Sequence, residues 1–135
     1  FQPLAQLAKK VKGEIKYHVM HADSWIKQLS NGTEESKARM QSALNFAFPY
    51  ALGIFESVDS EKELINSNVF LGEAELQKRW LEKVSAILQS AGLTVPAVDP
   101  SKAVNGGRQG FHSEYLQSLL SEMCEVVNTD PDAEW

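Results

Sequence analysis

Residues 4–29 read LAQLAKKVKGEIKYHVMHADSWIKQL, and this stretch decides the fold class. Its apolar residues recur at every third or fourth position, as they do along the buried face of an α-helix. They are Leu4, Leu7, Ala8, Val11, Ile15, Val19, Ala22, Trp25, Ile26 and Leu29. The spacing predicts a helix over about residues 3–29.

The same periodicity predicts further helices over about residues 34–56, 72–91 and 112–127. Between the first two helices, Asn31-Gly32 is predicted to form a left-handed terminator, and Thr33 to cap the following helix. Residues 59–71 are predicted to be irregular. No strand-like alternation is found, so the sequence predicts an all-α fold with no β-sheet.

The composition limits the possible functions. The chain has 135 residues, of which 43% are hydrophobic and 23% charged, as in one globular domain. A net charge of −5 with scattered lysines and arginines offers no basic stripe for nucleic acid. No apolar run approaches the ~20 residues that span a bilayer, so no membrane segment is expected. We therefore expect neither nucleic acid nor membrane as a partner.

Cysteine usage and the first residue suggest a location and a length. The single cysteine, Cys124, cannot form an internal disulfide, and no signal peptide precedes the first helix, so we expect a cytoplasmic protein. The chain starts at Phe1, already inside a helical pattern. We therefore expect a portion of a longer protein, obtained either as a cloned fragment or by proteolysis.

Residues 13–21, GEIKYHVMH, raise the question of a metal site. At ~100° per residue, His18 falls near the middle of the apolar face and is predicted to point into the core, with Glu14 at the edge of that face. Di-iron bundles place a glutamate three residues before the histidine, and this position holds Ile15, which has no lone pair for a metal. Glu14 could approach the same ion, but two ligands do not make a site. A core histidine with one hydrogen bond is therefore favoured.

Two runs of the sequence resemble a known family. Residues 12–50 read KGEIKYHVMHADSWIKQLSNGTEESKARMQSALNFAFPY, and residues 106–123 read GGRQGFHSEYLQSLLSEM, followed by an acidic tail that ends at Trp135. Both are similar to the corresponding runs in the structural subunit of bacterial phenylacetyl-CoA epoxidase complexes, which are also called phenylacetate-CoA oxygenases. The resemblance extends over nearly the whole chain.

The resemblance implies a ferritin-like helical bundle, of which this chain is the C-terminal part, because members of the family are nearly twice as long. It also implies a relation to the catalytic subunit of the same complex, whose corresponding helix carries the pattern Lys-Glu-Glu-x-x-His. Laid on this sequence, the pattern puts the histidine at His18, the ligating glutamate at Ile15 and its neighbour at Glu14. These positions resemble a degenerate di-iron site, so no metal, no cofactor and no catalytic residue are expected in this chain.

Two functions from different classes follow from the resemblance. The first is a non-catalytic structural subunit that pairs with and stabilises the di-iron catalytic subunit of an oxygenase. That oxygenase epoxidises the ring of phenylacetyl-CoA in aerobic phenylacetate degradation. The alternative is a di-iron carboxylate oxygenase acting in its own right. The first is favoured, because a di-iron site needs four carboxylates and two histidines and Ile15 replaces one of the glutamates. A helical protein of unrelated function would require both runs to match by chance.

The segment from Arg108 to Glu114 is a candidate contact with the catalytic subunit. It follows a long connection and concentrates arginine and aromatic side chains of the kind that anchor interfaces. The candidate residues are Arg108, Phe111, His112 and Glu114. The same residues suit docking of the last helix on the chain's own core, and the sequence leaves both possibilities open. Separately, the long apolar face of residues 4–29 predicts that this portion self-associates.

Overall fold

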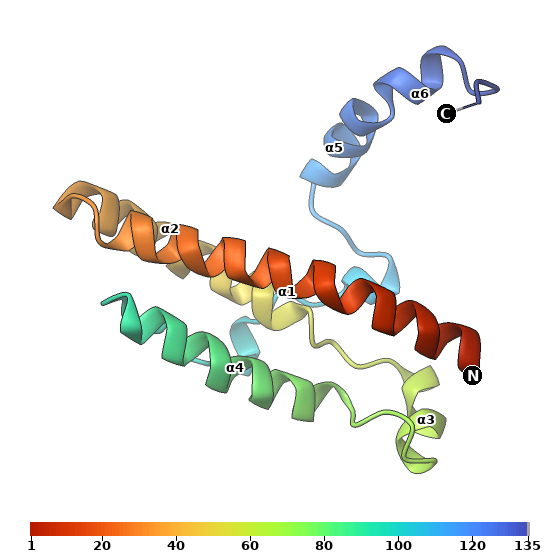
Figure 1. Cartoon of the computed structure of the whole chain (residues 1–135), viewed down its shortest axis with the longest axis horizontal. Helices are drawn as coiled ribbons and strands as arrows, with labels where there is room; N and C mark the ends of the chain where they lie inside the picture. Colours follow the sequence, from red (N-terminus) through yellow and green to blue (C-terminus); the bar gives the residue numbers. More distant parts are fainter. Residues whose placement is uncertain (135) are drawn as a thin grey trace.

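The computed structural model describes residues 1–134, and Trp135 lies outside the described residues. No strand occurs among residues 1–134, so the all-α prediction is confirmed (Figure 1). The α-helices are α1 (Gln2–Ser30), α2 (Glu34–Gly53), α3 (Lys62–Asn66), α4 (Glu73–Ser90), α5 (Tyr115–Met123) and α6 (Glu125–Thr129). The short 3-10 helices are η1 (Asp59–Glu61), η2 (Pro100–Lys102) and η3 (Gly107–Gln109).

The turn between α1 and α2 differs in one respect from its prediction. Thr33 caps α2 as predicted, because its Oγ1 accepts a hydrogen bond from the Ser36 amide at 3.1 Å. The prediction of a left-handed terminator at Asn31-Gly32 is wrong, since Asn31 has φ −102° and Gly32 is not among the residues with positive φ. The Asn31 Nδ2 instead donates to the carbonyl oxygen of Lys27 at 2.8 Å. A polar side chain thus satisfies a carbonyl of the last turn and makes a left-handed residue unnecessary.

Residues 59–71 hold η1 and α3, so the prediction of an irregular segment is wrong for this part. The Val58 amide donates to the Glu61 carboxylate at 3.4 Å, and the Ser67 hydroxyl donates to the carbonyl oxygen of Glu63 at 2.8 Å. These local bonds stabilise the two ends of a helical stretch that is too short to show an apolar period. Periodicity alone could therefore not find it.

The helix predicted over 112–127 is shorter at its start and divided. It begins at Tyr115, and Cys124, with φ −93° and ψ 0°, separates α5 from α6. The apolar spacing continues across Cys124, so the pattern could not report the single residue whose backbone leaves the helical region.

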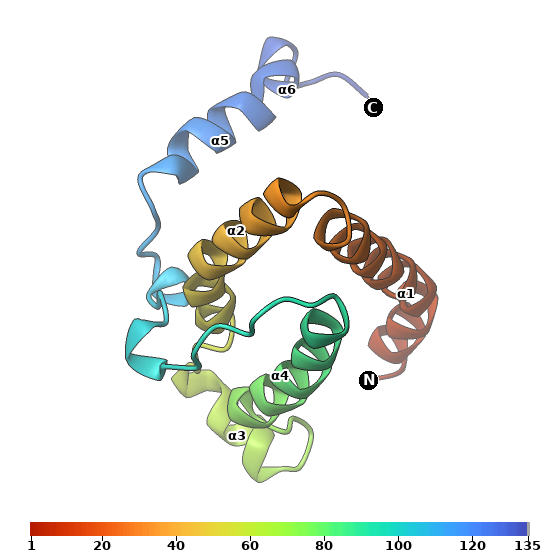
Figure 2. The same ribbon diagram turned by 90° about the vertical axis from the view of Figure 1, so that its left-hand side faces the viewer.

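The body of the structure consists of α1, α2 and α4, which lie side by side, with α3 at one end of α4 (Figures 1 and 2). Its buried core is small and lies where α4 ends, at Leu88, Ala91 and Leu93. Half-buried side chains from α1, α2, α4 and the following chain pack against it, namely Ile26, Met40, Leu44, Val84 and Val95.

An aromatic cluster joins α2 to α4 beside this core. The ring of Trp80 lies 5.8 Å from that of Phe48 and 5.5 Å from that of Phe55, measured between centroids. Phe48 and its neighbour Leu52 are buried. Large aromatic side chains bury much apolar area each, so this cluster supplies a large part of the contact between the two helices.

The connection after α4 is fastened to α2 rather than loose. The side-chain amide of Gln41 bonds both backbone groups of Thr94, accepting from its N–H at 2.8 Å and donating to its carbonyl at 2.9 Å. Further along, the Val104 amide donates to the carbonyl oxygen of Pro49 at 3.0 Å. The backbones touch closely here, because a Cβ added to Gly53 would lie 1.9 Å from the carbonyl oxygen of Val104.

Most of α1 is uncovered in the described chain. Every residue from 1 to 22 is exposed, including the apolar ones, with Leu4 at 63% and Ile15 at 60% exposure. Only the C-terminal part of α1, through Ile26 and Ser30, reaches the core. The apolar face is therefore present as predicted but has nothing packed on it among residues 1–134.

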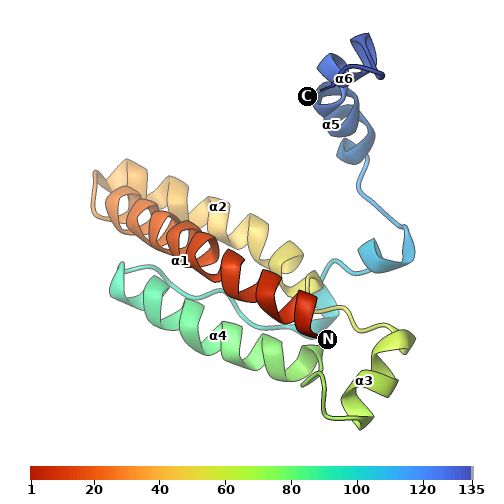
Figure 3. The same cartoon turned by 45° about the vertical axis from the view of Figure 1, so that its right-hand side comes forward.

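Residues 111–134, here called the C-terminal arm, carry α5 and α6 and stand off the body (Figures 1 and 3). All of them are exposed except Leu116, Cys124 and Ala133, which are half-buried. As for membranes, no helix within residues 1–134 combines the length with the hydropathy that a span requires.

The close approach at Gly53 gives a first test of the fold. Gly53→Ala is expected to lower the free energy of unfolding by about 1–3 kcal/mol, because the new methyl group would overlap the Val104 carbonyl. Gly13→Ala is the matched control, since nothing lies within 4 Å of a Cβ at Gly13 and the helix interior favours alanine by about 1 kcal/mol. Denaturant melts that show equal effects for the two variants would contradict the described packing.

The uncovered face of α1 gives a second test. Residues 1–135 alone are expected to self-associate at micromolar concentration, because association would remove a long exposed apolar face from water. Leu7→Glu should reduce the mass measured by light scattering, whereas Gln6→Glu, which places the same charge on the opposite side of the helix, should leave it unchanged. A monomer for the unmodified chain would count against this expectation.

Candidate functional site

The positions considered for a metal lie on α1, and all are exposed. Glu14 and His18 lie one helical turn apart, with Ile15 between them. The prediction that His18 points into a core is wrong for the described chain, because no described element buries residues 1–18. The second histidine of the stretch, His21, accepts a hydrogen bond at its Nε2 from the Trp25 indole at 3.0 Å.

These donors do not fit a di-iron centre by themselves. Among residues 1–134, no three histidine, cysteine, aspartate or glutamate side chains come together in a way that could hold a metal ion. Glu14 and His18 offer two donors, and Ile15 offers none. A centre that used His18 would have to draw its other ligands from outside the described residues.

A second polar group lies where the connection after α4 meets η1 and the start of α4. Arg108 bonds two carboxylates, through Nη1 to Glu61 and through Nη2 to Glu73 Oε1 at 2.6 Å. Glu73 is buried, at 7% exposure, in the first turn of α4. The hydrogen bond that Arg108 makes to Glu73, followed by the one to Glu61, raises the pKa of Arg108 above its ordinary value. Arg108 therefore stays charged at every pH at which proteins are handled. Its charge offsets the free-energy cost of burying the Glu73 carboxylate.

Glu56, at the end of α2, holds the loop that carries Arg108. Its carboxylate accepts hydrogen bonds from the amide of Gly106 at 2.9 Å, the amide of Arg108 at 3.3 Å and the side chain of Gln109 at 3.0 Å. Gly106 has φ 108°, a left-handed conformation that suits glycine. The set Glu56, Glu61, Glu73, Arg108 and Gln109 is called the Arg108 cluster below.

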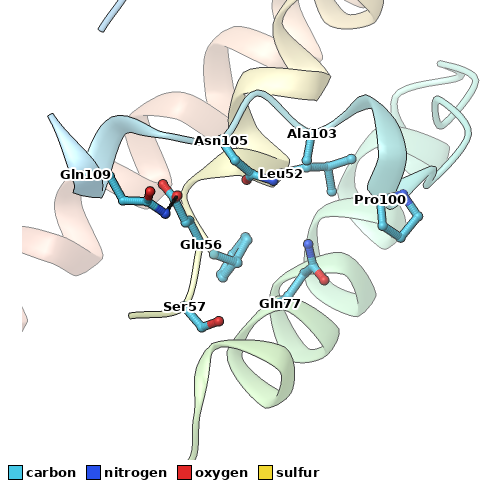
Figure 4. A pocket seen from close by; sticks show the side chains of 9 residues that line it. Leu52, Glu56, Ser57, Gln77, Pro100, Ala103, Asn105 and Gln109 are labelled. Carbon is cyan, nitrogen blue, oxygen red and sulfur yellow. Dashed lines mark hydrogen bonds between the residues drawn. The ribbon is translucent and has the colours of Figure 1, made fainter. Parts of the chain in front are cut away.

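A pocket of about 420 Å³ opens beside the Arg108 cluster (Figure 4). Its lining consists of Leu52, Phe55, Glu56, Ser57, Gln77, Pro100, Ala103, Asn105 and Gln109. Figure 4 shows Glu56 and Gln109 bonded to each other at one edge of it. The lining has no histidine or cysteine, and its one carboxylate already accepts three hydrogen bonds. This pocket is therefore poorly equipped for acid–base or nucleophilic chemistry.

The candidate contact residues differ in whether they make contacts within their own chain. Arg108 is exposed but bonds Glu61 and Glu73 of its own chain, as the internal-packing alternative predicts. Phe111 is 71% exposed, and His112 and Glu114 are exposed as well. These three remain candidates for a contact with another subunit.

Sequence reasoning missed the carboxylates of the Arg108 cluster. Arg108 lies 47 residues from Glu61 and 35 from Glu73, and Glu56 bonds groups 50 to 53 residues away. No short motif contains such partners. The only local signal was the placement of Glu73 in the first turn of the helix predicted over 72–91, which the helix dipole explains without any further role.

The structure thus defines an all-helical protein whose polar cluster braces the fold. The family described as "Phenylacetic acid catabolic protein" matches residues 1–135, so the chain belongs to this family. Over 132 residues, 98% of this chain, it is 28% identical to a subunit of the 1,2-phenylacetyl-CoA epoxidase of Escherichia coli (strain K12). The chain covers 52% of that relative, about half of its length. The resemblance seen in residues 12–50 and 106–123 is confirmed.

The Arg108 cluster can be tested through stability. Arg108→Ala is expected to lower the melting temperature by several degrees, because Glu73 would be left buried without its partner. Arg79→Ala is the matched control: Arg79 bonds Glu75 one turn away on the surface of α4, and such exposed pairs contribute little. Equal melting temperatures for the two variants would show that the cluster does not brace the fold.

Proposed function

We propose that this chain is part of a non-catalytic structural subunit in a multicomponent oxygenase that epoxidises the ring of phenylacetyl-CoA during aerobic phenylacetate degradation. In this proposal the subunit pairs with the di-iron catalytic subunit, stabilises it and works in the cytoplasm. The observation that carries the proposal is the similarity to the E. coli epoxidase subunit over 98% of this chain. Membership of the family described as phenylacetic acid catabolic protein supports the same pathway.

The ligand position on α1 supports a structural rather than a catalytic role. Oxygen activation between two irons needs carboxylate and histidine ligands that converge from several helices. Ile15 stands three residues before His18, where the ligating glutamate of such a helix belongs. A branched alkyl side chain cannot coordinate a metal, so the helix keeps the histidine of a metal site without the partner that would make it useful.

The uncovered face of α1 supports a place in a larger helical bundle. Helices of a ferritin-like bundle bury an apolar stripe against other helices of the same subunit. On α1 that stripe is exposed in the described chain, from Leu4 through Val19. We propose that residues 1–135 form the C-terminal part of such a ferritin-like subunit, with α1 as one of its bundle helices.

Under this proposal, the residues of this chain hold its helices together and position its contact surface, and they take part in no chemical step. Trp80 and the Arg108 cluster fix α4 and the following connection on α2. This leaves Phe111, His112 and Glu114 exposed at the start of the C-terminal arm. We propose that they take part in the contact with the catalytic subunit.

Iron content separates a structural subunit from an oxygenase in its own right. The full-length protein, purified alone, is expected to hold no stoichiometric iron by metal analysis, because Ile15 occupies the ligand position. Co-expressed with the iron-bearing subunit, it should purify as a complex that holds the iron of that subunit only. Ile15→Glu should not add iron, since one restored carboxylate does not complete a ligand set. Two irons per full-length chain purified alone would establish the alternative function.

A further inference from the structure

The C-terminal arm has an apolar face that is packed on no other element among residues 1–134. The apolar residues of α5 and α6 recur at three- and four-residue spacing, so they share one side of the helical path. They are Leu116, Leu119, Leu120 and Met123 in α5 and Val126 and Val127 in α6. These side chains are largely exposed rather than packed into a core: Leu119 is 52% exposed and Met123 70%. An isolated helix as short as α5 is marginal in water, so the arm needs a surface to pack on.

The base of the arm is fixed while its tip is free. Arg108 anchors the connection on Glu61 and Glu73 only three residues before the arm begins at Phe111. Gly110, with φ 86°, then turns the chain away from the body. The arm is thus fixed at residue 108 and has an uncovered apolar face. Such an element is suited to bind another molecule, because little conformational entropy is lost at its fixed end on binding.

The charge of the arm indicates the kind of surface that would cover it. Residues 109–134 contain no lysine or arginine. They contain the carboxylates of Glu114, Glu122, Glu125, Asp130, Asp132 and Glu134. On a helical wheel of α5, Glu122 falls outside the apolar side, and Glu125 is the first residue of α6. An apolar face bordered by acidic side chains complements an apolar groove bordered by basic ones, and like charges would repel an acidic partner.

We propose that the C-terminal arm is a docking element whose apolar face seats in an apolar groove, flanked by lysine or arginine side chains, on a different subunit. The inference rests on the proposed function, which supplies a second subunit. It goes beyond the contact assigned to residues 111–114, because it places the main contact on α5 and α6 and states the chemistry of the partner's surface.

A second copy of this chain is the competing occupant, because α1 also combines apolar and basic residues. Its lysines are Lys9, Lys10, Lys12, Lys16 and Lys27. Under the proposed function, however, the apolar face of α1 is covered by other helices of its own subunit. A second copy of the arm would then find that face already occupied.

The test compares two double variants of the full-length protein for binding to the purified iron-bearing subunit. Leu119→Glu with Met123→Glu puts two charges on the apolar face. Gln117→Glu with Ser121→Glu puts the same charges at the same spacing on the opposite face. Glutamate favours helices, so neither pair should unfold α5. Both variants should melt like the unmodified protein, because the arm packs on nothing in the described body. A lower melting temperature for the first pair alone would show that the arm packs within its own subunit and would overturn the inference. The first pair should weaken binding by about tenfold or more and the control by less than about twofold.

The charge complementarity has its own measurement. Glu122→Gln with Glu125→Gln should weaken binding at low salt and flatten its dependence on salt concentration, because fewer ion pairs then form with the basic flanks. An unchanged salt dependence would overturn the assignment of a basic partner surface.

The remaining outcomes separate the inference from the proposed function. If the unmodified protein binds the iron-bearing subunit and the apolar-face variant binds equally well, the arm is not the docking element, while the proposed function stands. If the apolar-face variant instead lowers the mass of the protein alone in light scattering, a second copy covers the arm and the inference is overturned. If the unmodified protein does not bind the iron-bearing subunit at all, the proposed pairing fails, and the inference fails with it.

Discussion

The packing of Trp80 against Phe48 and Phe55 is the contact on which the rest of the structure depends. It joins α4 to α2 and to the residues just after α2, and the small core of Leu88, Ala91 and Leu93 lies at the end of α4. The chain that follows α4 can be fastened to α2 through Gln41 only because the two helices are already held together. With so few buried side chains, one cluster of large aromatic rings supplies much of the apolar area that stabilises the body.

Charge pairing then fixes what the apolar contacts leave free. A buried carboxylate such as Glu73 is costly unless a cation bonds it, and Arg108 is the side chain that does so. This requirement engages the guanidinium of Arg108 within its own chain, although the residue is exposed. The residues that follow it, beginning at Phe111, are exposed and make no such pairs among residues 1–134.

The region of α1 around His18 combines an uninterrupted apolar stripe with isolated polar side chains. Ile15 has no donor atom for a metal, but it occupies an apolar position in that stripe, so the helix keeps a face that can pack in a bundle. The stripe is exposed among the described residues, so the described chain shows the face without the surface that would cover it.

The sequence by itself determined the all-α class, the approximate bounds of α1, α2 and α4 and the cap at Thr33, because apolar spacing and capping are local properties. It also identified the family, through runs that include Ile15 and His18. It could not reveal the Arg108 cluster, whose partners are 35 to 53 residues apart. Nor could it show that His18 is exposed in this chain or that α5 stands off the body. Those features depend on which surfaces meet in three dimensions, and periodicity reports which face of a helix is apolar without reporting whether anything covers it.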